Sequence, residues 1–173
     1  TGAWTSDLRH GEGTMRAPDG EWVYDGHWHN DVREGHGLLK TLRRATSPSA
    51  GGTATPPPTA GDGSAAANGE LQYEGEWKGD QRHGEGTALY SDGNTFTGTW
   101  RDNARSDGKG TMKFASGDEY AGYWRHEQRH GKGCCSFGDG TRYDGEWSHG
   151  QRHGEGELTF SNGDVFLGRW VHG

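Results

Sequence analysis

Apolar and polar positions alternate along most of this chain, and the alternation recurs in units of 23 or 24 residues. Each unit opens with an aromatic residue, a glycine and a tryptophan at every second position, and continues with Gly-x-Gly, a small or apolar residue and usually a second aromatic residue. Side chains two apart on a β-strand share a face, so the pattern predicts two strands per unit with one aromatic, glycine-notched face. In one unit the predicted strands are 73–77 and 84–90, joined by a link through 79–83.

The signature aromatic-x-Gly-x-Trp occurs six times in full, and a shortened seventh copy begins at Gly2. The full copies are 24–28, 73–77, 96–100, 120–124, 143–147 and 166–170. Each unit is too short for a strand-helix-strand crossover, and the Asp-Gly, Asn-Gly and Ser-Gly pairs between units favour hairpin turns. Self-similarity at a fixed period of this length is typical of a repeat protein. We therefore expect an all-β fold of repeated β-hairpins.

One long segment interrupts the period. Between the first two full copies the tryptophans are 49 positions apart, which is about one unit too many. Residues 43–68 carry runs of glycine, serine, proline and alanine that are typical of a low-complexity linker. We expect one array over 1–173 of about six to seven repeats, truncated at both ends because the chain begins and ends inside a repeat, with 43–68 inserted as a loop in the second repeat. A solvated loop is one interpretation of this segment, and a docking or phosphorylation segment around Thr46 and Ser47 is the other.

Composition alone resembles that of a disordered chain, since only 28% of residues are apolar and the net charge is −7. The regular placement of glycine and tryptophan overrules that interpretation. With 25 acidic against 18 basic residues and no basic stripe among the aromatics, we expect no nucleic-acid binding. The same charge argues against anionic membranes. Cys134 and Cys135 are adjacent, so on one strand they would point to opposite faces and could not form a disulfide with each other. This fits a reducing, intracellular setting.

The recurrent glycines and histidines form no recognisable catalytic, nucleotide or metal motif. No Gly-x-Gly extends to Gly-x-Gly-x-x-Gly, and each opens a strand rather than a phosphate-binding helix. Arg-His-Gly recurs at 9–11, 82–84, 129–131 and 152–154. Equivalent histidines on neighbouring hairpins would lie ~10 Å apart, which is too far for two ligands of one zinc ion, so we interpret them as turn-forming, stacking residues. We expect no enzymatic activity, no metal and no cofactor.

The aromatic-x-Gly-x-Trp signature, followed by Gly-x-Gly and a closing Asp-Gly, resembles the MORN repeat (membrane occupation and recognition nexus). The resemblance covers most of the chain outside the insertion. It implies an elongated, single-layer, twisted antiparallel sheet with one hairpin per repeat and an aromatic-lined groove, and no catalysis by the repeats themselves. Members of this family occur in cilia and flagella, at cytoskeletal and membrane junctions, and beside catalytic domains.

A single sheet has no second layer to cover its aromatic face, so that face is self-covered, partner-covered, or both. An extended aromatic surface of this kind suits an amphipathic helix or an extended peptide. The predicted partner-binding groove consists of Tyr73, Trp77, Tyr90, Phe96, Trp100, Phe114, Tyr120, Trp124, Phe137, Tyr143, Trp147 and Phe160. Within it, the tryptophans can be structural while the outer rings of the second strands are exposed.

Two hypotheses for function follow. The first is a non-catalytic scaffold that binds a protein segment, or a second copy of itself as a homo-oligomer, in a cytoplasmic, cytoskeletal assembly such as the axoneme of a cilium or flagellum. The second is a regulatory or phospholipid- and membrane-targeting module attached to an enzyme domain outside this fragment. The sequence supplies no polybasic patch for the lipid version.

Overall fold

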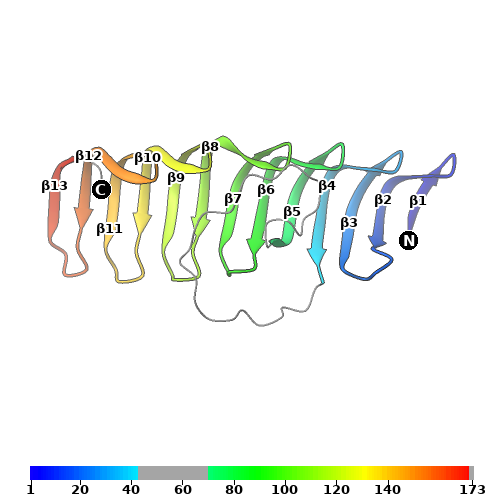
Figure 1. The fold of residues 1–173 in the computed structure, drawn as a ribbon, viewed down its shortest axis with the longest axis horizontal. Helices are drawn as coiled ribbons and strands as arrows, with labels where there is room; N and C mark the ends of the chain where they lie inside the picture. The colour runs from blue at the N-terminus through cyan, green and yellow to red at the C-terminus, as the bar shows by residue number, and fades with distance from the viewer. Residues whose placement is uncertain (43–69, 172–173) are drawn as a thin grey trace.

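The computed structural model describes residues 1–42 and 70–171, in which every regular element is a β-strand (Figure 1). The strands form one 13-stranded sheet in chain order, and each strand pairs antiparallel with its neighbours in the sequence. This arrangement confirms the predicted elongated, single-layer sheet of hairpins. The expected insertion at 43–68 lies outside the described residues.

The strands are β1 Gly2–Thr5, β2 Leu8–Arg16, β3 Trp22–His29, β4 Val32–Thr41, β5 Glu70–Lys78, β6 Gln81–Tyr90, β7 Thr95–Arg101, β8 Ala104–Lys113, β9 Glu119–Arg125, β10 Gln128–Ser136, β11 Arg142–Ser148, β12 Gln151–Thr159 and β13 Val165–Trp170.

Along one edge of the sheet, each hairpin closes through only two residues with positive φ, as in a type I′ turn. These turns are Ser6-Asp7, Asn30-Asp31, Gly79-Asp80, Asp102-Asn103, His126-Glu127 and His149-Gly150. The predicted link through 79–83 was therefore too long, because Arg82 and His83 already belong to β6. A bulge next to them, with Gly84 at φ 58°, restores the register of the second half of the strand.

The opposite edge carries three-residue turns where the sequence places Asp-Gly, Asn-Gly or Ser-Gly. In the turn between β6 and β7, the Tyr90 amide donates to the Asn94 carbonyl and the Gly93 amide donates to the Tyr90 carbonyl. Gly93 has φ 85°, a conformation that glycine adopts without strain. The hairpin turns predicted at this edge are confirmed.

One glycine from every strand pairs with a glycine on each neighbouring strand, and together they form a row across the whole sheet, here called the glycine ladder. Its members are Gly2, Gly13, Gly26, Gly37, Gly75, Gly86, Gly98, Gly110, Gly122, Gly133, Gly145, Gly156 and Gly168. An aromatic ring lies directly against most of this backbone. A Cβ on Gly86, for example, would lie 2.3 Å from the Tyr73 Oη, and one on Gly37 would lie 2.2 Å from the Tyr24 Oη.

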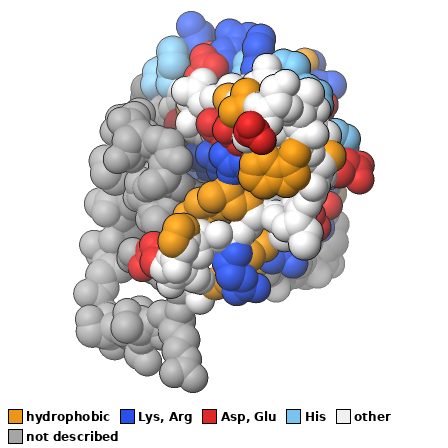
Figure 2. Space-filling view, turned by 90° about the vertical axis from the view of Figure 1, so that its right-hand side faces the viewer, with side chains coloured by type: hydrophobic (Ala, Val, Ile, Leu, Met, Phe, Trp, Pro, Cys, Tyr) orange, Lys and Arg blue, Asp and Glu red, His pale blue; other side chains and the backbone are white. Residues whose placement is uncertain are grey.

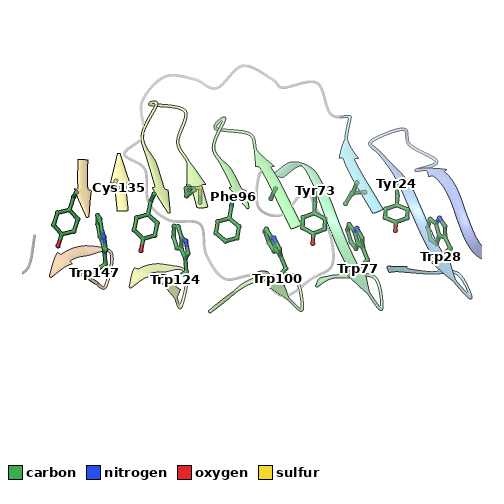
Figure 3. Close-up of a cluster of buried hydrophobic side chains, with 14 residues drawn as sticks. Tyr24, Trp28, Tyr73, Trp77, Phe96, Trp100, Trp124, Cys135 and Trp147 are labelled. Carbon is green, nitrogen blue, oxygen red and sulfur yellow. The ribbon is translucent and has the colours of Figure 1, made fainter. Parts of the chain in front are cut away.

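The core is the line of rings that lies on the glycine ladder. The first aromatic residues of the repeats form a ring row, consisting of Tyr24, Tyr73, Phe96, Tyr120, Tyr143 and Phe166. Its first five members are almost fully buried. Figure 3 shows rings of this row alternating with the tryptophans along one line. The single layer thus gains a core by laying side chains on its own backbone, without a second layer.

We expect Gly86→Ala to lower the free energy of unfolding by about 2–3 kcal/mol, because the new methyl group would collide with the buried Tyr73 ring. Gly79→Ala, in the turn of the same hairpin, is the matched control. A Cβ there meets nothing within 4 Å, so only its φ of 56° opposes the change, at about 1 kcal/mol. Urea unfolding followed by tryptophan fluorescence measures both variants, and equal losses would contradict the assigned role of the ladder.

Candidate partner-binding surface

Eight of the twelve residues predicted to line a groove lie in the core. Tyr73, Trp77, Phe96, Trp100, Tyr120, Trp124, Tyr143 and Trp147 are each at most 7% exposed. Their rings meet edge to face in a continuous chain, in which each of the first five members of the ring row contacts the tryptophan of its own repeat and that of the next. Tyr73, for instance, lies 5.2 Å from Trp77 and 5.3 Å from Trp100 between ring centroids. Such T-shaped pairs are favoured by the ring quadrupole and tie each repeat to its neighbour.

Buried polar groups of these rings are bonded to the backbone. The Trp77 indole N–H donates to the Gly37 carbonyl at 3.1 Å, and Trp100 donates to the Gly86 carbonyl at 3.1 Å. Each acceptor belongs to the glycine ladder on the preceding strand. The Tyr73 hydroxyl donates to the Glu76 carbonyl at 3.0 Å, three residues further along its own strand. The tryptophans therefore connect repeats, while the tyrosine hydroxyls fix each ring within its repeat.

Arginine covers the tryptophan face, which the sequence analysis missed. The Arg33 guanidinium lies 4.4 Å from the Trp77 ring centroid, and its Nε is 2.9 Å from Asp80 Oδ1 in the next turn. Arg82 stacks on Trp100 at 4.7 Å in the same way and is itself buried. Arg82 is the first residue of a recurrent Arg-His-Gly motif, and Arg33 holds the same position in Arg-Glu-Gly, so the recurrent arginine is the signal in the sequence. These stacked arginines cover the core along the edge of the type I′ turns.

Burial also changes the acidity of the ring row. Removal from water raises the pKa of Tyr24 to about 12, and Arg33 opposes the shift. The pKa of Tyr120 rises to about 12 for the same reason, against the opposing charge of Arg129. Both phenols therefore stay protonated, and can donate their hydrogen bonds, well above the ordinary titration range of tyrosine.

The other four predicted residues lie at the border of the aromatic face and are here called the outer row: Tyr90, Phe114, Phe137 and Phe160. Each begins one of the three-residue turns. The first three are half-buried and pack against the core, while Phe160 is 43% exposed. Of the predicted groove residues, these are the rings that a partner can reach.

Carboxylates accompany the outer row along the same edge. The turns 91–94, 115–118, 138–141 and 161–164 contain no lysine or arginine, but each holds one aspartate. We call Asp92, Asp118, Asp139 and Asp164 the acidic border. Side chains link the first three of these turns, since Asn94 Oδ1 accepts from the Ala115 amide and Asp118 Oδ1 accepts from the Gly138 amide. The outer row thus combines partly exposed rings with one aspartate in each adjoining turn.

The opposite face of the sheet is mostly polar and makes hydrogen bonds and ion pairs across strands. Thr87 and Thr97 share a hydrogen bond of 2.9 Å, and Lys113 lies 3.6 Å from Glu119. Tyr123, 45% exposed, is an isolated aromatic residue there. Within the described residues, no three metal-ligating side chains cluster together. Cys135 is a free thiol whose pKa is raised by burial, so it is a poor nucleophile.

The fold and its aromatic face place the chain in the class of single-layer repeat proteins built from β-hairpins. The family model of the MORN repeat matches residues 1–22, 24–40, 73–95, 96–119, 120–142 and 143–165. The chain therefore belongs to the MORN-repeat family, whose repeats are non-enzymatic modules of protein interaction or membrane association. No curated protein matches the sequence.

Two solved structures are similar in outline to the chain. The SAS-4 (dCPAP) TCP domain of Drosophila melanogaster, in complex with a proline-rich motif of Ana2 (dSTIL), shares 12% identity at a TM-score of 0.38 and covers 92% of this chain and 79% of its own. The TCP10 domain of Danio rerio CPAP, in complex with a STIL peptide, shares 9% identity at a TM-score of 0.38 and covers 92% of this chain and 64% of its own. Likeness at this level carries no argument about function.

Across residues 1–42 and 70–171, the structure contains no helix that could span a membrane.

Stability should fall as the pH rises from about 10 to about 12. The unfolded chain releases its phenolic protons near pH 10, whereas Tyr24 and Tyr120 hold theirs to about 12 in the fold. The unfolded state therefore binds fewer protons over this interval, and the free energy of unfolding decreases, with no effect well below pH 10. Urea unfolding at a series of alkaline pH values measures the slope.

Two variants isolate this slope. Replacing Tyr24 and Tyr120 by phenylalanine should reduce it, because two of the buried phenols are gone while Tyr73 and Tyr143 remain. Phe96→Tyr adds a phenol to an equivalent buried position and should steepen it. If the free energy of unfolding fell equally with pH in the unsubstituted chain and in both variants, burial of these phenols would not be the origin of the raised pKa.

Proposed function

We propose that this protein is a non-catalytic scaffold whose outer row and acidic border together dock an amphipathic, basic helix of a partner protein in a cytoskeletal or ciliary assembly. The observation that carries the proposal is the pairing of partly exposed rings with carboxylates along one edge of the sheet. Apolar contact supplies most of the binding free energy, and charge supplies orientation.

The spacing of the outer row suits a helix. Equivalent residues lie two strands apart, which is about 9.6–10 Å in a sheet with strands ~4.8 Å apart. Seven residues of an α-helix span about 10.5 Å. A helix laid across the strands can therefore place one apolar side chain on each ring by repeating it every seven residues, as in other helix-in-groove complexes.

The charge of the acidic border selects the flanks of that helix. Asp139 and Asp164 are exposed, and hydrogen bonds from Thr141 lower the pKa of Asp139 below its usual range, so its carboxylate is charged at neutral pH. Lysine or arginine beside the apolar positions would meet this edge favourably. An acidic helix or an anionic membrane would be repelled, which disfavours the membrane-targeting form of the second hypothesis but not its regulatory form.

The direct test is a designed helical peptide with leucine at every seventh position flanked by lysine, whose binding to the 1–173 chain is measured by fluorescence anisotropy. Replacing Phe137 and Phe160 by serine should weaken binding more than tenfold, because each ring buries apolar area in the complex. Asp139→Asn with Asp164→Asn should weaken it about three- to tenfold at low salt. Asparagine keeps an oxygen for the turn hydrogen bonds.

Tyr123→Ser is the matched control, because it removes an exposed ring from the polar face and should leave binding unchanged. Near-ultraviolet circular dichroism checks that the tryptophans of every variant remain packed. Undiminished peptide binding by the folded double-serine variant would overturn docking at the outer row. Binding to anionic vesicles that is stronger than peptide binding, and that the same variant loses, would favour the lipid-targeting hypothesis instead.

A further inference from the structure

Exposed lysine and arginine side chains gather on the polar face of the sheet, beside the type I′ turns. Figure 2 looks along the sheet from β1 and shows Lys, Arg and His side chains along the upper edge, which is the edge of these turns. No run of consecutive basic residues marks this surface in the sequence, because its members come from five different strands. We call them the basic row: Lys78, Arg101, Lys109, Arg125 and Lys132.

Three members of the basic row hold the same position in successive repeats. Lys78, Arg101 and Arg125 each follow the buried tryptophan of their repeat and end a strand, so they lie two strands apart. With ~4.8 Å between strands, their spacing along the edge is about 10 Å. The fold therefore turns residues 23 and 24 positions apart in the sequence into a regular line of charge.

The other two members lie on either side of an exposed ring. Lys109 pairs with Tyr123 across β8 and β9, and its Nζ lies 5.6 Å from the ring centroid. Lys132 follows Gly131 on β10, and a Cβ on that glycine would lie 3.5 Å from the Tyr123 Cβ. The ring, 45% exposed, adds an apolar contact in the middle of the basic row.

The charges of the basic row are not neutralised within the chain. Among residues 1–42 and 70–171, no ion pair includes one of its members. The three members at the edge have uncharged partners across the hairpin, which are Gln81, Ala104 and Gln128.

Acidic side chains close to the basic row are engaged elsewhere. Glu127, in the turn after β9, accepts a hydrogen bond of 2.9 Å from the Arg105 Nε. Glu146 is the cross-strand partner of Lys132, but its carboxylate is turned toward β12, where it occupies the space that a side chain on Gly154 would need. The basic row therefore remains open to a negatively charged ligand.

We infer that the basic row binds an extended segment of a partner protein that is rich in glutamate or aspartate, laid across the strands on the face opposite the outer row. Charge complementarity carries the inference, because five exposed cations lie together in a chain whose net charge is −7. A run of acidic residues repels itself and stays extended. Three extended residues span about 10 Å, so every third carboxylate can meet one of the regularly spaced cations.

Membranes and nucleic acids fit this surface less well. A bilayer would also contact Glu74 and Glu85, which are exposed on the same face. Single-stranded nucleic acid is bound through several aromatic rings on which successive bases stack. The basic row contains one such ring, that of Tyr123, among the residues that the structure describes.

The probe is a peptide of about ten glutamates with an uncharged fluorophore. The basic row crosses from β5 to β10, which is ~24 Å, and about eight extended residues cover that distance. Fluorescence anisotropy of the peptide is followed as the 1–173 chain is added. We expect saturable binding that weakens about tenfold when the salt is raised from about 50 to about 200 mM. No saturable binding at the lower salt concentration would overturn the inference.

Charge reversal tests the position of the site. Arg101→Glu with Arg125→Glu should weaken binding more than about tenfold, because each attraction becomes a repulsion. Arg16→Glu with Lys40→Glu is the matched control. It changes the net charge equally and on the same face, since both residues pair with Val23, but it lies at the opposite edge. This control should retain binding within about threefold, and equal losses in the two variants would refute the basic row as the site.

Two further comparisons keep the result specific. Arg101→Gln with Arg125→Gln keeps long side chains, should remain folded, and should weaken binding about threefold. Serine at Phe137 and Phe160 should leave it unchanged, because those rings lie on the other face. If a thymidine oligonucleotide or phosphatidylserine vesicles bound more tightly than the peptide, and the glutamate variant lost that binding, a protein segment would be the wrong ligand.

Discussion

The contact between an aromatic ring and the backbone of two paired glycines is the constraint on which the rest of this structure depends. Most domains bury the apolar face of a sheet against a second layer. Here the Tyr73 ring packs on the backbone of its own sheet, because Gly75 and Gly86 have no side chains that would prevent the contact. Since the spacing is below that of an ordinary Cβ contact, the ladder excludes every other residue for reasons of space rather than of backbone conformation. Thirteen strands can therefore share one line of rings without a covering domain.

This arrangement makes each repeat dependent on the next. A ring of the ring row is covered by its own tryptophan and by that of the following repeat, whose indole also bonds to the ladder carbonyl between them. The free energy of folding of such an array is a sum of terms for each repeat and for each contact between neighbouring repeats. Phe166 shows the consequence. Among the described residues it meets one tryptophan ring, that of Trp170, and is 52% exposed, whereas Phe96, between two tryptophans, is 1% exposed.

The period of two in the sequence was sufficient to predict the strands, the hairpins and the two unlike faces. It was not sufficient to separate Tyr73, which is core, from Phe160, which is exposed, because both lie on the same face. The difference depends on which rings lie over ladder glycines, as Tyr73 lies over Gly75 and Gly86. Strand pairing within a bulged hairpin is a property of register rather than of periodicity. The arginine of Arg-His-Gly was overlooked for a related reason, since its stacking on Trp100 spans two repeats.

Because the outer row lies apart from the glycine ladder, its residues can be substituted without disturbing the core. A change at Gly86 or Trp100 disturbs a surface that the buried Tyr73 ring contacts, so fold and sequence are tightly coupled there. Phe160 and Asp164 lie at a turn that the backbone closes by itself, through the Phe160 amide and the Asp164 carbonyl. Their side chains can therefore change chemistry without a change of fold. A repeat protein of this design can keep one scaffold and acquire different partners by altering only the rings and charges along that edge.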